Sequence, residues 1–317
     1  MQKGKYKITN WSQYNKALVK RGSINIWIEE SSLEEWYSSF HTARAGRPFV
    51  YSDSAILMLL VIRERFNLTL RSLEGFVASI FKFMNLTIPV PSYTQICRRA
   101  KTLHKRIKRL SKHNPIDIIL DSTGLKIYGE GEWKVRTHGK SKRRIWRKLH
   151  LAIDGETQDC VAFELTTHSV GEAKPAARVL NKIPGKLKIV RGDGAYDPSI
   201  VRQTAYKKGA RMIAPPPRHA SIKGATDGWE KDRDEDIATI YELGGKEAGR
   251  RPWKEKVGYF KRSLIEMAIL RIKTMFGEKL KSRLLGTQRT EVLCKCLILN
   301  KMNECGMPKG VWEKQVA

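Results

Sequence analysis

The stretch IDIILDSTG, residues 116–124, decides the fold class, because an apolar run of strand length meets an aspartate there. RKLHLAID at 147–154 alternates apolar and polar side chains with period two, and CVAFELTT at 160–167 has a similar strand-like composition. EAKPAARVLNKI at 172–183 is typical of a short helix, and KLKIVRGD at 186–193 of a fourth strand that stops at glycine. Three antiparallel strands, a helix and a further strand predict an α/β domain with a mixed sheet flanked by helices.

The residues before this stretch predict a helical region. Apolar helices are expected at 52–66 and at 70–83, and the prolines at 89–91 separate them from a strongly basic helix. Three short helices that end in a basic one are what a helix-turn-helix module needs, with packed helices and a solvated basic face as the alternative. We therefore expect a helical, helix-turn-helix-like DNA-binding region at residues 1–110, and the α/β domain at residues 111–317.

The rest of the chain is expected to interrupt this domain and then complete it. The pattern of apolar positions weakens between residues 197 and 258, where three consecutive prolines and the acidic sequence DGWEKDRDED occur. We predict an insertion at about 197–258. A long helix is expected from about Tyr259 to Phe276, and another apolar helix at 292–302.

The charge balance indicates a polyanionic partner. The 317 residues include 60 lysines and arginines against 32 aspartates and glutamates, which gives a formal net charge of +28. Such side chains release condensed counterions when they neutralise phosphates, so DNA or RNA is favoured over a merely basic surface. A membrane is disfavoured, because no long basic amphipathic helix occurs and the longest apolar run, 55–62, is too short to cross a bilayer.

Cysteine usage and the first residues of the chain favour a cytoplasmic protein. The five cysteines are an odd number without a CxxC framework, which argues against zinc fingers and against a disulfide scaffold. No signal-peptide core follows the basic start of the sequence. Cys294 and Cys296 are expected to be small buried residues rather than metal ligands.

Two aspartates have positions that suit ligand binding. Asp121 is expected to end its strand, and Asp193 to end a later strand between Gly192 and Gly194, where missing side chains let a ligand approach the backbone. Taken singly, an acid at a strand end is more often a turn or cap residue.

A third acid, Glu266, is selected by helical geometry. At about 100° per residue, it lies within roughly 60° of a hydroxyl, a guanidinium and an ammonium on the helix surface. These three neighbours are Tyr259, Arg262 and Lys273. The adjoining apolar arc is expected to face the core and contains Leu264, Ile265, Ala268, Ile269, Ile272, Met275 and Phe276. A solvated face with salt bridges is the alternative.

Phosphoryl transfer is a reaction in which three such acids could act together as metal ligands. Two hard cations about 3.5–4 Å apart can activate an attacking oxygen and stabilise a leaving one, and they need carboxylates on rigid elements. Histidine-based and cysteine-based sites are less favoured, because the sequence contains no HExxH, CxxC or GxSxG pattern.

Two basic segments are candidate DNA contacts. The segment 136–150 holds seven lysines or arginines and no acid, with a tryptophan between them that can stack on a base. A solvated hairpin tip is the alternative for this segment. The second segment runs from Arg98 to Lys112. The candidate contacts are Lys140, Lys142, Arg143, Arg144, Trp146, Arg147, Lys148, Arg98 and Arg99.

Several blocks of the chain together resemble the bacterial insertion-sequence transposases of the IS-five family. The signature blocks are DSTGLKIYGEGEW at 121–133, KRRIWRKLHLAID at 142–154, VRGDGAYD at 190–197 and YFKRSLIEMAILRIK at 259–273. The last block has the family's spacing of tyrosine, two residues, arginine, three residues, glutamate, six residues and lysine. Residues 10–27 and 46–60 resemble the family's opening, so the resemblance covers nearly the whole chain.

The resemblance implies a DDE transposase with a ribonuclease-H-like catalytic domain. Asp121, Asp193 and Glu266 would be its acidic triad and would bind two Mg²⁺ ions, with Mn²⁺ as a substitute, beside Tyr259, Arg262 and Lys273. These would be the DNA-binding residues nearest to the triad. The enzyme would bind double-stranded DNA at terminal inverted repeats, cleave the element ends and join them to target DNA, as a homo-oligomer associated with the bacterial nucleoid. A metal-dependent nuclease without strand transfer and a non-catalytic DNA-binding regulator are the alternatives.

Overall fold

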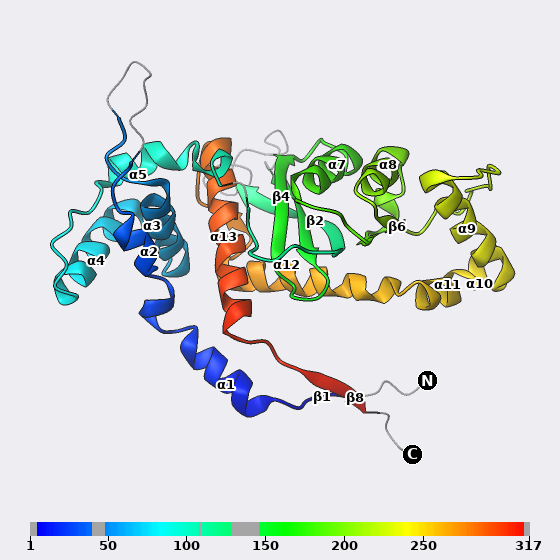
Figure 1. Ribbon diagram of the computed structural model, residues 1–317, viewed down its shortest axis with the longest axis horizontal. Helices are drawn as coiled ribbons and strands as arrows, with labels where there is room; N and C mark the ends of the chain where they lie inside the picture. Colours follow the sequence, from blue (N-terminus) through cyan, green and yellow to red (C-terminus); the bar gives the residue numbers. More distant parts are fainter. Residues whose placement is uncertain (1–4, 40–47, 108, 128–145, 314–317) are drawn as a thin grey trace, which may run out of the picture. The chain divides into compact units, whose positions relative to one another are not determined.

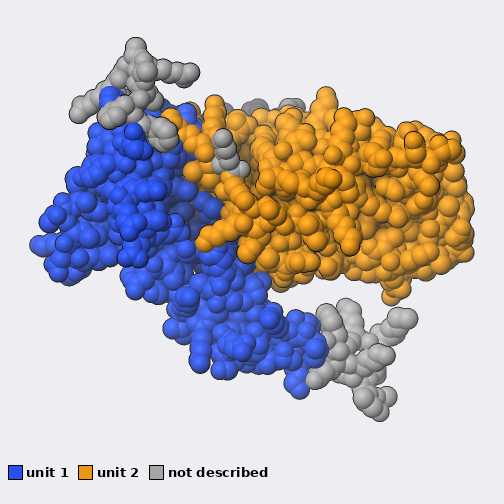
Figure 2. Space-filling model, in the orientation of Figure 1, with its two compact units in different colours: residues 1–103, 297–317 blue, residues 104–296 orange. Residues whose placement is uncertain are grey.

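The computed structural model describes residues 5–39, 48–107, 109–127 and 146–313 (Figure 1). The chain forms two compact units, which Figure 2 shows in different colours. Unit 1 comprises Met1–Leu103 with Leu297–Ala317, and unit 2 comprises His104–Cys296. The last part of the chain thus belongs to the unit of the first hundred residues. The division into 1–110 and 111–317 as functional regions stays a prediction.

Unit 1 is mainly helical, and two strands from the ends of the chain pair in it. Its elements are β1 (Lys5–Ile8), α1 (Trp11–Lys20), a 3-10 turn (Ile24–Ile26), α2 (Glu30–Glu34), α3 (Asp53–Arg65), α4 (Leu70–Phe83), α5 (Tyr93–Ala100) and β8 (Gly310–Glu313). The strands β1 and β8 are antiparallel. Helix α13 (Leu285–Cys305) begins in unit 2 and ends in unit 1.

Side-chain caps set the beginnings of the three helices that the sequence predicted. The Ala55 N–H donates to Ser52 Oγ at 3.0 Å before α3, and Thr69 caps α4 in the same way. Ser92 and Gln95 form a reciprocal capping box at α5. The predicted helices at 52–66 and 70–83 therefore match the structure closely, because their start signals are local.

Unit 2 is built on a mixed sheet. Its strands are β2 (Asp117–Ile127), β3 (Trp146–Asp154), β4 (Cys160–Thr167), β5 (Ile189–Arg191), β6 (Arg211–Ile213) and β7 (Lys279–Leu280). The order is β4-β3-β2-β5-β6, with β7 beside β2. Strand β3 runs antiparallel to both β2 and β4, whereas β2, β5 and β6 run parallel to one another. This ribonuclease-H-like order confirms the predicted fold class.

Helices flank the sheet of unit 2 (Figure 1). Beside the sheet lie α7 (Ala173–Lys182), α8 (Ser199–Lys207) and α12 (Ser263–Phe276). Beyond its edge strand β6 lie α9 (Gly228–Glu242), α10 (Gly245–Ala248) and α11 (Arg250–Lys256), as Figure 1 shows. The 3-10 turns are Leu103–Lys105, Gly194–Tyr196 (η3) and Tyr259–Arg262 (η4). Helix α7 packs on β3 and β4, and α12 packs on β2. The main core joins Leu120, Ala152 and Ala162 of the sheet to Val179 and Leu180 of α7.

Two sequence-based boundaries are corrected by the sheet. Strand β2 does not end at Asp121 but continues to Ile127, because β3 pairs with it as far as Lys126. The predicted insertion at 197–258 begins too early, because α8 packs on β6 and β6 forms the edge of the sheet beside β5. Helices α9, α10 and α11 follow β6 in the chain, and their assignment as an insertion stays a prediction.

The predicted long helix is a 3-10 turn, η4, followed by α12. Glu266 therefore lies in the first turn of α12 rather than in the middle of a longer helix. Of the predicted apolar arc, Ile265, Ala268 and Ile272 are buried, whereas Met275 is exposed. Fewer apolar residues of α12 are therefore buried against the core than the predicted apolar arc contains.

The structure bears on two further expectations, namely the burial of two cysteines and the absence of a helix that could cross a membrane. Cys294 and Cys296 are buried as predicted, and none of the five cysteines forms a disulfide. Within the described part of the chain, no helix combines the length and the apolar character needed to cross a membrane.

Candidate active site

Asp121 lies in the central strand of the sheet and is half-buried. The Ser122 N–H donates to its Oδ1 at 2.8 Å, and Arg262 Nη1 donates to its Oδ2 at 3.3 Å. Burial raises the pKa of Asp121, and the charges of Asp193 and Glu266 raise it further, whereas Ser122 and Arg262 act in the opposite direction. The three candidate acids therefore lie within electrostatic reach of one another.

Asp193 follows β5 and begins the turn η3. The Ala195 N–H donates to Asp193 Oδ1 at 2.9 Å, so the aspartate caps this turn. Parallel pairing places Ile119 of β2 opposite Arg191 of β5. Asp121 and Asp193 each lie two residues further on, so they lie at the same height along the sheet. The prediction that Asp193 ends its strand agrees with the structure.

Glu266 reaches the same place from α12. Its carboxylate forms an ion pair with Arg262 Nη2, and its side chain is 52% exposed. Arg262 thus contacts Asp121 and Glu266 at once, and it stands one helical turn before Glu266. Burial lowers the pKa of this guanidinium, but the neighbouring Tyr259, Glu266, Asp121 and Asp193 more than reverse that effect.

The residues predicted beside the triad differ in their surroundings. Tyr259 is 9% exposed and lies under the Arg262 guanidinium, whose central carbon is 6.0 Å from the centre of the ring. Burial raises the pKa of Tyr259. Lys273 instead forms an ion pair with Glu278 at 3.8 Å, and no described contact joins it to the triad. The structure therefore brings Tyr259 and Arg262 to the site, whereas Lys273 pairs with Glu278.

Sequence reasoning missed a second polar group beside Asp121. Glu172, which precedes α7, accepts from Ser122 Oγ at 2.9 Å and from Lys148 Nζ at 2.9 Å. The buried phenol of Tyr196 lies near Asp121 and Glu172, and burial raises its pKa well above the usual range. The position of Ser122 next to Asp121 was a possible signal. No spacing in the sequence identified Glu172.

Part of the predicted basic DNA contact lies outside the described residues, namely Lys140, Lys142, Arg143 and Arg144. The following residues lie on β3. Trp146 covers Gly124 of β2, where an added Cβ would come within 3.1 Å of the indole. Arg147 Nε donates to Gln288 at 2.9 Å, and Lys148 pairs with Glu172. These two cations already have partners within unit 2.

The two arginines of α5 have opposite surroundings. Arg98 is exposed, whereas Arg99 is 7% exposed. Arg99 Nη1 donates to the Tyr51 carbonyl at 2.7 Å, and Nη2 forms an ion pair with Asp53. Its guanidinium therefore ties α5 to the start of α3, and Arg98 is the cation of this pair that is accessible at the surface.

The donor set at the triad fits a divalent cation. Carboxylate oxygens are the ligands that Mg²⁺ and Mn²⁺ prefer. The pKa of Asp121 is raised mainly by burial and further by the charges of Asp193 and Glu266, and a bound cation would offset both effects. Arg262 supplies positive charge between Asp121 and Glu266. Among the described residues, no three acidic, histidine or cysteine side chains are already gathered closely enough to hold an ion.

Comparison with known proteins gives matches to two protein families and to solved structures that include two complexes. Residues 112–301 match a family described as "Transposase DDE domain", and residues 19–130 match a second family with that description. A piggyBac transposase synaptic complex with hairpin DNA is 10% identical, with a TM-score of 0.43, and the match covers 95% of this chain and 76% of that one. The Mos1 strand transfer complex is 13% identical, with a TM-score of 0.22 and coverages of 73% and 82%. Since the first family match spans more than half of the sequence, the chain belongs to the transposases with a DDE domain.

Proposed function

We propose that this transposase binds the terminal inverted repeats of a DNA element, cleaves the element ends and joins the freed 3′-hydroxyl groups to target DNA. The observation that carries the proposal is that Asp121, Asp193 and Glu266 come from three separate elements to share the field of Arg262. Carboxylates held on a sheet and on a packed helix suit two-metal phosphoryl transfer. The motif blocks support a bacterial insertion sequence of the IS-five family.

The three carboxylates are proposed to hold two Mg²⁺ ions, which Mn²⁺ can replace. When bound, the ions supply stabilisation of charge on the attacking and leaving oxygens of the phosphodiester. The Ser122 N–H orients Asp121 by donating to Oδ1, which leaves Oδ2 facing Arg262. The Ala195 N–H orients Asp193 in the same way. These backbone donors hold both aspartates in place before DNA binds.

Arg262 is proposed to change partners during the reaction. With Asp121 and Glu266 neutralised by bound cations, the guanidinium would be able to bind a DNA phosphate with two parallel hydrogen bonds. Tyr259 is buried under it, so we propose that Tyr259 supports the guanidinium rather than contacting a base. Lys273 is proposed to bind a phosphate at the margin of the site.

Recognition of the element ends is proposed for residues 1–110. The exposed Arg98 and the basic residues that follow it supply phosphate contacts there, and the basic segment 136–150 supplies more. The net charge of +28 supports this assignment. A homo-oligomer on DNA would hold both ends of one element, in the cytoplasm of a bacterium.

A joining assay tests the proposal. Duplexes that carry the inverted repeats flanking the gene are incubated with the full-length protein, Mg²⁺ and a supercoiled target plasmid, both uncut and pre-cut to expose the 3′-hydroxyl. We expect uncut ends to be cleaved and pre-cut ends to be joined, and ends that lack the 3′-hydroxyl to stay unjoined. Cleavage without joining would indicate the nuclease alternative. Binding with neither reaction would indicate a regulator.

A further inference from the structure

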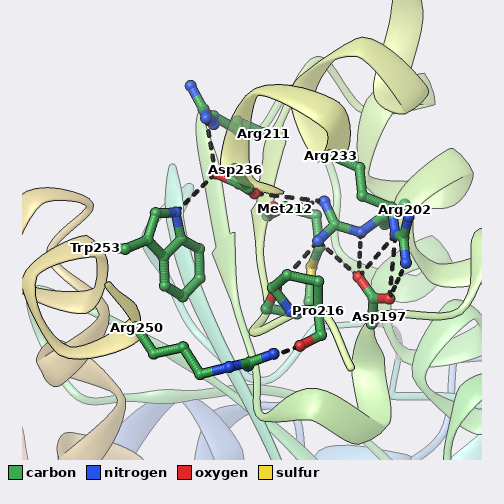
Figure 3. Close-up of polar contacts among 10 residues, drawn as sticks. Asp197, Arg202, Arg211, Met212, Pro216, Arg233, Asp236, Arg250 and Trp253 are labelled. Carbon is green, nitrogen blue, oxygen red and sulfur yellow. Dashed lines mark hydrogen bonds and ion pairs between the residues drawn. The ribbon is translucent and has the colours of Figure 1, made fainter. Parts of the chain in front are cut away.

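A buried ionic cluster joins the α/β core to the helices that follow β6 (Figure 3). At its centre is Arg202 of α8, which is 1% exposed. Its Nε donates to Asp197 Oδ1 at 2.8 Å, and its Nη atoms donate to the carbonyls of Met212 at 3.2 Å and Ala214 at 3.1 Å. The guanidinium therefore connects the end of β6 to the loop that follows β5.

Asp197 also accepts hydrogen bonds from an arginine of helix α9. Arg233 of α9 donates to Asp197 Oδ2 from Nε at 3.2 Å and from Nη2 at 3.1 Å, and its side chain is 16% exposed. Asp197 is 7% exposed, so its charge depends on these two arginines. Helix α9 thus holds the loop after β5 directly, as Figure 3 shows.

The loop between Asp193 and Asp197 is a short turn that is held by backbone hydrogen bonds and close packing. The Tyr196 N–H donates to the Asp193 carbonyl at 3.1 Å, and the Asp197 N–H donates to the Gly194 carbonyl at 3.2 Å. A Cβ placed on Gly192 would come within 2.7 Å of the Tyr196 side chain. Because this turn is short and tightly packed, a force that fixes Asp197 also fixes Asp193.

A second carboxylate in the cluster has no contact with that loop. Asp236 of α9 accepts from Arg211 Nη2 at 2.9 Å and from Trp253 Nε1 at 3.2 Å, and it forms a longer ion pair with Arg202 Nη1 at 3.8 Å. It therefore binds α9 to β6, to α11 and to α8. Arg211 and Arg233 are two arginines of one cluster, but only Arg233 reaches Asp197. This difference supplies a matched control.

We infer that Asp197 and Arg233 are positioning residues, through which helix α9 sets the conformation of the Asp193 loop. This inference rests on the proposed function only in taking Asp193 as the second carboxylate. It gives helix α9 a role, because Arg233 of α9 holds the loop that carries Asp193. Neither Asp197 nor Arg233 touches the reacting atoms; both act through Asp193.

The experiment compares Arg233→Gln with Arg211→Gln in the full-length protein. Hydrogen–deuterium exchange is measured without metal on a peptide that covers residues 192–198, and end cleavage is measured against Mg²⁺ concentration. For Arg233→Gln we expect at least about 10-fold faster exchange of the Ala195, Tyr196 and Asp197 amides. We expect cleavage to be about 10-fold to 100-fold slower, because small misplacement of a reacting group is costly. Arg211→Gln should leave both within about three-fold of the unmodified protein.

The exchange measurement separates this inference from the proposed function. Unchanged exchange in Arg233→Gln, or an equal increase in Arg211→Gln, would overturn the positioning role. Full activity of Asp193→Asn would instead overturn the choice of Asp193 as a catalytic residue, whatever the exchange rates. Should Arg233→Gln not fold, Arg233→Lys takes its place, because it keeps the charge and loses the forked contact. The inference then requires faster exchange of the same amides, and unchanged exchange would overturn it.

Discussion

Arg262 contacts Asp121 at 3.3 Å although 141 residues separate them in the sequence. Asp121 lies on β2, and Arg262 ends the turn that leads into α12. The contact therefore ties the strand of the first candidate carboxylate to the helix of the third. Because Arg262 also pairs with Glu266, one guanidinium joins two of the three candidate carboxylates.

Replacing Glu266 with Gln keeps the shape of the side chain but removes one charge at the site. We expect normal folding and near-normal binding to element ends, with cleavage and joining reduced by more than about 100-fold. Glu255→Gln is the matched control, because Glu255 pairs with the exposed Arg251 at 3.5 Å and lies outside the site. An active Glu266→Gln protein, measured in the joining assay, would show that another residue is the third carboxylate.

Glu278→Gln tests a rival glutamate that lies just beyond the end of α12. Glu278 pairs with Lys126 at 3.4 Å and with Lys273 at 3.8 Å. These exposed pairs contribute on the order of 1 kcal/mol or less, so we expect cleavage within about three-fold of the unmodified protein. Loss of activity in a folded Glu278→Gln protein would move the site toward Lys273.

The metal requirement is tested by exchanging the divalent cation. Mg²⁺ or Mn²⁺ should support cleavage, whereas Ca²⁺ should support DNA binding with little cleavage, because its larger and looser shell positions the reacting oxygens poorly. Excess chelator should abolish cleavage and leave end binding measurable by gel shift. End cleavage that continues unchanged in chelator contradicts the proposed carboxylate mechanism.

Substitution of Arg98 should weaken DNA binding, whereas substitution of the neighbouring Arg99 should lower the stability of the fold. For Arg98→Gln we expect weaker end binding, with the slope of log K against log salt concentration reduced by about 0.9, as for one lost phosphate contact. Arg99→Gln should instead lower the melting temperature, because it removes the ion pair with Asp53 and the hydrogen bond to Tyr51. A smaller salt slope in Arg99→Gln alone would reverse these assignments.

His150 should make the stability of the protein sensitive to acid. Burial, reinforced by the nearby Lys148, lowers the pKa of His150 from its usual 6.5 to about 4. Because the folded state disfavours the charged ring, this contribution to stability is complete above pH 6.5 and is lost as the pH falls toward 4. The loss amounts to at most about 3 kcal/mol.

The check compares urea unfolding at pH 7.5 and pH 4.5. In His150→Gln the difference between the two free energies of unfolding should shrink, because the group that must take up a proton is gone. His168→Gln serves as the control, because His168 is exposed. An undiminished pH effect in His150→Gln would assign the acid sensitivity to other groups.

Local signals in the sequence were sufficient for several elements. The helices α3 and α4 begin after Ser52 and Thr69, and β4 has the predicted bounds, because caps and strand patterns act within a few residues. The same locality limited the prediction of β2. Its continuation beyond Asp121 depends on pairing with β3, which is a partner from a distant part of the chain.

The sequence by itself determined the mixed sheet, the basic character and the three candidate acids, since periodicity, charge and motif spacing can be read along one chain. Only the tertiary structure decided which side chains meet. It paired Arg262 with Asp121, joined Glu172 to Ser122 and Lys148, and buried Arg99 away from solvent. It also assigned β6 to the sheet and Arg233 to Asp197, where the sequence predicted only an insertion. The physical reason is that a long-range contact depends on how the backbone brings two segments together, and no residue type or spacing specifies that arrangement alone.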